Sequence, residues 1–239
     1  MADQPSKSSE PGLPHHIRDM PSSGKLSVNE YIRLGIIYPG MDDQGLLNSF
    51  RDVRNKLLKL SDYKNFVCLV TSLSPYDETS LLSLNLAAVF AFDRSRSALV
   101  VDCSAVMNVI DSLISVDEVI GLIDFIEMDY DNLDSLLYEC RMERVRVIPA
   151  GRLTETRTET LESTRMRELI IELKQRYPDR FIFINAPNMA VSSEVQVLAN
   201  ISDMVLFEMS AGTVTSGQIT EAIAMIGPEK VAGVLFREG

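Results

Sequence analysis

Short apolar runs that resemble buried strands alternate along this chain with longer segments that have helical spacing. The strand-like runs cover residues 66–70, 98–101, 144–148, 181–184, 203–208 and 231–236. Apolar strands separated by helices are typical of a parallel sheet whose two faces are both covered. The alternation therefore predicts an α/β protein with three layers, in which helices flank a mainly parallel central sheet.

The segments between these runs supply the predicted helices. They cover residues 46–60, 80–91, 119–126, 131–137, 160–176, 193–201 and 215–226. A further short helix is predicted to begin near Ser27, a residue type that caps helices well. In segment 46–60 the apolar side chains recur at helical spacing, which predicts one buried stripe and a polar outer face.

Composition divides the chain into a tail and one folded unit. Residues 1–24 combine prolines with serine, glycine and charged residues and contain few aliphatic side chains, as in a disordered or docking tail. The whole chain has 239 residues, of which 46% are hydrophobic, enough to bury one substantial core. We therefore expect a single domain over residues 25–239.

Charge and rare residues exclude several classes of function. The net charge of −11 argues against nucleic acid and anionic membrane surfaces as direct partners, because both require a basic face. Cys68, Cys103 and Cys140 lack metal-binding spacing, so we expect buried small side chains. The two histidines, His15 and His16, supply too few ligands for a metal. No apolar stretch approaches 18 residues, so a cytoplasmic location is expected, with docking on a membrane protein still open.

Residues 70–80 have the context of a phosphate-binding loop, because they connect a strand-like run to a helix. A functional loop places Gly and Lys before a Ser or Thr, and Glu78 and Thr79 occupy those two positions before Ser80. A carboxylate about 4 Å from a phosphate repels it by roughly 4 kcal/mol per unit charge. The loop predicts very weak nucleotide binding. By itself it is equally consistent with a turn that never bound phosphate.

Several short motifs occur in the order in which they occur in one known family. They are the loop positions Ser72, Pro75, Glu78, Thr79 and Ser80, then Asn85-Leu86-Ala87, Val101-Asp102-Cys103-Ser104, Gly121-Leu122-Ile123-Asp124, Pro149-Ala150-Gly151, Thr160-Leu161-Glu162-Ser163 and Asn185-Ala186-Pro187-Asn188. With these motifs the chain resembles, over about residues 30–236, the cytoplasmic domain of bacterial tyrosine kinases from capsule and exopolysaccharide loci. Those kinases are related to the ParA/MinD P-loop ATPases, so the resemblance implies a P-loop NTPase-like fold.

Departures from the family pattern fall on the chemistry. The resemblance places Thr79 where the family has its loop lysine, Ser104 where it has a second carboxylate, and Asn185 where it has a strand-end aspartate. Ser80 and Asp102 remain. Mg²⁺ prefers carboxylate and phosphate oxygens, so these changes remove most of its ligand charge. The resemblance therefore implies no catalytic residue, no bound metal and lost or very weak Mg-ATP binding. The family's tyrosine-rich C-terminal tail has no counterpart, because no tyrosine follows Tyr177.

One non-catalytic motif survives in part. The family uses E-x-x-R-x-x-R on an early helix for ring assembly, and this chain reads Asn48-Ser49-Phe50-Arg51-Asp52-Val53-Arg54. Spacing by three residues places Arg51 and Arg54 on one helix face, where they could meet the carboxylates of a neighbouring subunit. The alternative is an ordinary solvated basic face.

The resemblance implies a catalytically inactive, tyrosine-kinase-like protein with a regulatory or scaffolding role in exopolysaccharide biosynthesis or export. The implied partner is a membrane-bound polysaccharide chain-length determinant or an active kinase paralogue, and a homo-oligomer is possible by the same resemblance. Two alternatives remain open. One is an ATP-binding kinase or ATPase with a rebuilt pocket, and the other is a ParA/MinD-like positioning protein that lacks ATPase activity.

Overall fold

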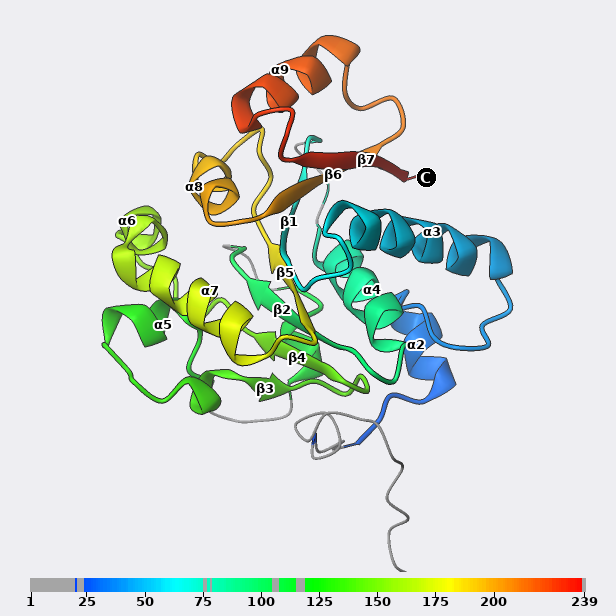
Figure 1. Cartoon of the computed structure of the whole chain (residues 1–239), viewed down its shortest axis with the longest axis horizontal. Helices are drawn as coiled ribbons and strands as arrows, with labels where there is room; N and C mark the ends of the chain where they lie inside the picture. The colour runs from blue at the N-terminus through cyan, green and yellow to red at the C-terminus, as the bar shows by residue number, and fades with distance from the viewer. Residues whose placement is uncertain are drawn as a thin grey trace, which may run out of the picture.

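A seven-stranded sheet runs through the part of the chain that the structure describes (Figure 1). The structure is a computed structural model, and it describes Met20 and residues 24–74, 77, 79–104, 108–114 and 119–237. Most of the predicted tail, with His15 and His16, lies outside these residues, as do Pro75 and Glu78 of the first loop.

The strands follow the order β3-β4-β2-β5-β1-β6-β7 across the sheet. Their bounds are β1 (Val67–Ser72), β2 (Ser97–Asp102), β3 (Tyr138–Glu139), β4 (Val145–Ile148), β5 (Arg180–Asn185), β6 (Met204–Ser210) and β7 (Val231–Arg237). Every neighbouring pair is parallel except β3 with β4, which is antiparallel. The predicted α/β class with a mainly parallel sheet is confirmed.

Helices cover both faces of the sheet and complete the three layers (Figure 1). One face carries α2 (Val28–Leu34), α3 (Gln44–Leu60) and α4 (Ser80–Ala91); the other carries α5 (Leu122–Glu127), α6 (Arg157–Glu162), α7 (Thr164–Arg176), α8 (Glu194–Asn200) and α9 (Ser216–Ile226). Short 3₁₀ turns lie at Asp111–Leu113 and Leu133–Leu136. No helix in the described ranges combines the length and the apolar composition needed to cross a bilayer.

Alternating side chains of β1 explain why this largely apolar strand lies inside the sheet, between β5 and β6. Cys68 and Val70 enter the core beneath α3 and α4, whereas Val67 and Leu69 enter the core beneath α7 and α8. A strand buried on both faces is rich in apolar residues, and β1 is buried throughout, with apolar side chains at its first four positions. All three cysteines are free and buried, which confirms their prediction as small interior side chains.

The predicted helix 160–176 is two helices in the structure. Ser163 separates α6 from α7 with extended backbone angles, and its hydroxyl accepts a hydrogen bond from the amide of Met166 at 3.2 Å. Serine stabilises a helix start better than a helix interior, which is why the chain breaks at this residue.

Two further segments also differ from their predicted form. The helix predicted over 119–126 begins only at Leu122, and the segment 131–137 contains a single 3₁₀ turn. Strand β3, with two residues, was not predicted, because two residues are too few to show a periodic pattern.

Candidate functional site

The carboxyl ends of β2, β5 and β1 lie side by side at one edge of the sheet, where ligands bind in folds of this type. Asp102 ends β2, and Asn185 ends β5 as its direct register partner. Thr79 lies immediately before α4. The fold therefore brings together three residues that the sequence assigned to nucleotide or metal positions, of which Asp102 keeps the family's residue type and Thr79 and Asn185 depart from it.

A buried hydrogen-bond network links these three side chains. Asn185 donates from Nδ2 to Oδ1 of Asp102 at 2.8 Å, and its Oδ1 accepts from the hydroxyl of Thr79 at 2.7 Å. The Ser83 hydroxyl lies 3.3 Å from the same amide oxygen. Asp102 and Asn185 are each 1% exposed and Thr79 is 4% exposed. The amide of Asn185 is thus engaged by protein at both its oxygen and its nitrogen.

Asp102 is satisfied from the other side by the segment that follows β2. Its carboxylate accepts from the amide of Ser104 at 2.8 Å and from Nδ2 of Asn108 at 2.7 Å, and Nδ2 of Asn108 also lies 2.8 Å from the hydroxyl of Ser104. Burial raises the pKa of Asp102 above its usual range, against these hydrogen bonds, which lower it. The carboxyl group is held by neutral donors.

Neutral side chains, Thr79 and Asn185, occupy two of the positions that the resemblance relates to nucleotide and metal binding. Among the described residues, no group of three or more histidine, cysteine, aspartate or glutamate side chains could hold a metal ion. Asp102 is the one carboxylate in the network, and the amide and hydroxyl groups around it bind hard cations less well. Thr79, in the position of the family's lysine, offers a hydroxyl that is already hydrogen-bonded.

Of the remaining predicted loop residues, the structure describes Ser72 and Ser80. The Ser72 hydroxyl bonds within its own turn, accepting from the amide of Ser74 at 3.0 Å and donating to its carbonyl. Ser80 is buried as the first residue of α4. Pro75 and Glu78 are outside the described residues, so their predicted roles have no structural test.

Arg157 is a buried residue beside the network that the sequence did not reveal. Its Nη2 donates to the carbonyl oxygens of Cys103 and Ser104, and its Nε lies 3.4 Å from the carboxylate of Glu194. The arginine therefore fixes the chain just after β2, where Asp102 ends the strand. A single arginine at the start of a short helix carries no motif by which sequence could identify it.

Asp77 is a second residue with a role that the sequence did not assign, although it lies within the first loop. Its carboxylate accepts hydrogen bonds from the amide and hydroxyl of Ser210 and from Arg237. The only available signal was its position between Pro75 and Glu78, since sequence cannot show that the ends of β6 and β7 lie opposite.

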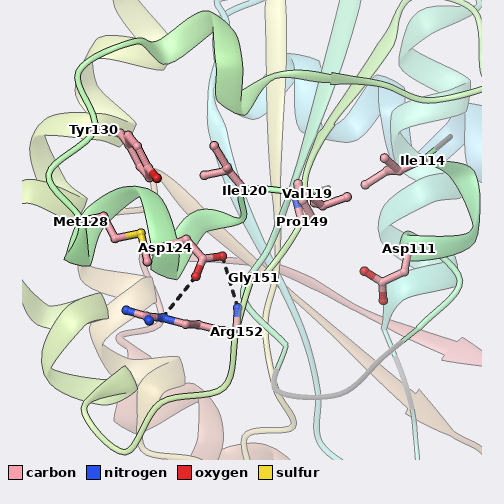
Figure 2. Close-up of a pocket in the computed structure, with 10 residues that line it drawn as sticks. All are labelled: Asp111, Ile114, Val119, Ile120, Asp124, Met128, Tyr130, Pro149, Gly151 and Arg152. Atoms are coloured by element: carbon pink, nitrogen blue, oxygen red, sulfur yellow. Dashed lines mark hydrogen bonds and ion pairs between the residues drawn. The ribbon is translucent and has the colours of Figure 1, made fainter. Parts of the chain in front are cut away.

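A pocket of about 540 Å³ opens near the end of β4 (Figure 2). Apolar side chains and three charged ones line it, among them Asp124 and Arg152, whose carboxylate and guanidinium are 3.2 Å apart. Gly151, one of the lining residues, packs against Gly121 so closely that a Cβ on Gly121 would lie 2.0 Å from the Gly151 Cα. The Gly121 and Pro149-Ala150-Gly151 motifs of the sequence thus meet because only glycine permits this approach.

The two candidate assembly arginines do not both face outward as expected. Arg51 bonds to Asn48 on its own helix at 3.1 Å. Arg54 turns toward α4 and donates from Nη1 to the carbonyl oxygen of Val89 at 3.1 Å, and burial lowers its pKa. Because Val89 lies in the last turn of α4, Arg54 satisfies a carbonyl that the helix itself leaves open.

Comparison with solved structures places this fold among P-loop proteins. The kinase domain of the Escherichia coli tyrosine kinase ETK superimposes with a TM-score of 0.71, at 19% identity, covering 80% of this chain and 75% of that chain. The BceF tyrosine kinase domain gives 0.66, 23% identity and coverages of 81% and 77%. The septum site-determining protein MinD from Pyrococcus horikoshii, complexed with Mg-ADP, gives 0.57, 19% identity and coverages of 71% and 68%.

Sequence comparison adds no closer relative: no protein-family model and no curated protein matches the chain. At identities below 25% the structural likeness shows the fold alone, and the chemistry has to be argued from the residues of this chain. The resemblance predicted from the motifs is thereby confirmed in its architecture, since this chain has the three-layer P-loop NTPase-like fold shared by bacterial tyrosine kinase domains and the ParA/MinD ATPases.

Proposed function

We propose that this protein is a catalytically inactive, tyrosine-kinase-like protein with a regulatory or scaffolding role in exopolysaccharide biosynthesis or export. The observation that carries the proposal is the closed hydrogen-bond network of Thr79, Asn185 and Asp102. In phosphoryl transfer the protein contributes positioning and charge neutralisation by a lysine, Mg²⁺ and carboxylates. Here the neutral side chains of Thr79 and Asn185 occupy two of these positions and bond to each other, and Asn185 also bonds to the one remaining carboxylate, Asp102.

The network also supports a very weak affinity for nucleotide. A ligand entering between Thr79 and Asn185 would have to break a buried hydrogen bond, which leaves a desolvated group that costs about 1–3 kcal/mol when unpaired. Because Thr79 stands in place of a lysine, no positive charge at this position attracts the phosphate and offsets that cost. The expected net result is that Mg-ATP does not occupy this edge of the sheet.

Thermal unfolding with and without millimolar Mg-ATP tests the proposal. A ligand at 100 times its dissociation constant adds about 2.7 kcal/mol of stability, an easily measured rise in Tm. We expect no change in Tm, with Mg²⁺ alone as the control for metal effects. A rise that depends on ATP concentration would contradict the proposal and support the ATP-binding alternative.

The proposed partner is a membrane-bound polysaccharide chain-length determinant or an active kinase paralogue, which would keep the protein at the cytoplasmic side of the membrane. The support is the fold likeness to tyrosine kinase domains together with the exopolysaccharide context implied by the motifs. Affinity purification from membranes of the native host tests it. Recovery of such a protein supports the scaffold role, whereas recovery of none of these proteins together with self-association alone would favour the positioning alternative.

A further inference from the structure

The side chain of Asp77 is held by hydrogen-bond donors at the ends of β6 and β7. Its Oδ2 accepts from the amide of Ser210 at 2.9 Å, and its Oδ1 accepts from the Ser210 hydroxyl at 2.7 Å and from Nη2 of Arg237 at 2.6 Å. The Asp77 side chain is 4% exposed. These contacts join Asp77, which lies between β1 and α4, to the ends of the neighbouring strands β6 and β7.

A second buried carboxylate, Glu208, reaches the same guanidinium. Its Oε1 lies 3.7 Å from Nη1 of Arg237, and its side chain is 7% exposed. Its Oε2 is buried and makes no hydrogen bond to the described residues. Two carboxylates therefore share one arginine, and only Asp77 is fully hydrogen-bonded.

Few other charges face Glu208 from the elements packed around it. Helix α4 has no charged side chain, and β1 has none either. From α3, the Nζ of Lys56 lies 3.3 Å from the position of a Cβ on Gly233, whose register pair with Leu206 is two pairs before that of Glu208. Burial raises the pKa of Glu208 to about 7, Arg237 lowers it and Asp77 raises it.

We propose that Asp77, Glu208 and Arg237 form a pH-dependent contact, here called the clasp, which holds Asp77 to the ends of β6 and β7 while Glu208 is protonated. When Glu208 is protonated, Arg237 forms its ion pair with Asp77 alone and holds the Asp77 carboxylate against Ser210. When Glu208 ionises, the buried carboxylates compete for one guanidinium and repel each other, and the hold on Asp77 weakens. The clasp depends on charges and contacts alone, so it stands whether or not the protein binds nucleotide.

Amide hydrogen exchange at Ser210 in the full chain tests the clasp directly, because that amide donates to Asp77. After correction for the intrinsic pH dependence of exchange, its protection factor should fall severalfold in one transition centred on about pH 7. The amide of Val205, at the other end of β6, is the internal control, since it donates to the backbone carbonyl of Lys230. Its protection should not follow that transition.

Glu208→Gln should keep Ser210 protected and remove the transition, because the amide is neutral at every pH. Glu172→Gln, whose side chain is 59% exposed, is the matched control and should leave the transition in place. The wild-type profile is decisive even if Glu208→Gln folds poorly. Protection of Ser210 that is independent of pH in the wild type, or a transition that persists in Glu208→Gln, would overturn the clasp.

Discussion

At Asn185 a single residue determines whether the buried network can exist. An amide presents a donor to Asp102 and an acceptor to Thr79 at once, and the two distances of 2.8 and 2.7 Å show both in use. An ionised carboxylate at this position could only accept. It would face Asp102 as a second negative charge without a donor between them.

Asn185→Asp, which recreates the carboxylate expected from the kinase resemblance, should destabilise the protein by roughly 3 kcal/mol, since a hydrogen bond to a buried charge is lost and like charges meet. Urea unfolding measures the loss. Asn55→Asp on the exposed face of α3 is the control and should change stability by about 0.5 kcal/mol or less. If Mg²⁺ restored the stability of Asn185→Asp, a workable metal site would remain and the inactive assignment would be weakened.

Glu208 should also make global stability depend on pH. The unfolded chain releases this proton near pH 4.5 and the folded protein near 7, so between these values the folded state binds more protons. The free energy of unfolding attributable to Glu208 is therefore largest below pH 4.5 and declines as pH rises through 7. One unit of pKa difference is worth about 1.4 kcal/mol, so the decline is roughly 3 kcal/mol.

Denaturant unfolding of the wild type and of Glu208→Gln across this range measures that decline as a difference, in which other titrating groups cancel. The wild type should lose stability relative to the variant as pH rises. Parallel stability curves would show that Glu208 titrates alike in both states.

Among the elements, α3 supplies a hydrogen-bond donor to a carbonyl oxygen that α4 leaves unbonded at its C-terminal end. Arg54 reaches the carbonyl of Val89, and Arg144, from the turn before β4, donates to the carbonyl of Ala91 at 2.6 and 3.0 Å. Helix α4 has no basic residue in its own last turn and is buried almost throughout. Its C-terminal carbonyls are thus satisfied by arginines from elsewhere in the chain.

The two arginines of α3 should accordingly differ in effect. Arg54→Ala should lower stability by about 1 kcal/mol through the lost hydrogen bond, whereas Arg51→Ala should leave stability within about 0.5 kcal/mol. If α3 mediates assembly, Arg51→Ala should weaken self-association or partner binding in light scattering and pull-down. Equal association of Arg51→Ala and wild type would assign Arg51 to a solvated helix face.

Some strand and helix positions follow from the sequence, whereas the break between α6 and α7 does not. The central strands were predictable because burial on both faces favours a run of apolar residues, which each of them contains, and the structure confirms the helix start predicted at the capping residue Ser27. The break at Ser163 was missed because the apolar spacing continues through it, and only the hydrogen bond to Met166 reveals the new start.

On the scale of the molecule, motif order predicted the architecture and which residues gather at the sheet edge. Asp102 was predicted as a retained metal position and Asn185 as an altered one, and parallel strands bring their ends together as register partners. The clasp and the contacts of Arg157 could not be predicted, because each joins residues far apart in the chain through side-chain directions. Asp77 and Arg237 are separated by 160 positions and share no pattern.

The buried cysteines have a practical meaning for solution work. Cys68 and Cys140 lie in the layer beneath α3 and α4, Cys103 lies in the opposite layer, and burial raises the pKa of all three thiols, that of Cys140 to about 12. A thiol that is neither accessible nor ionised reacts slowly with maleimides and disulfide reagents. The labelling rate of each thiol therefore reports how often the layer around it opens. A comparison of the rates of Cys103 and Cys68 would compare the opening rates of the two layers.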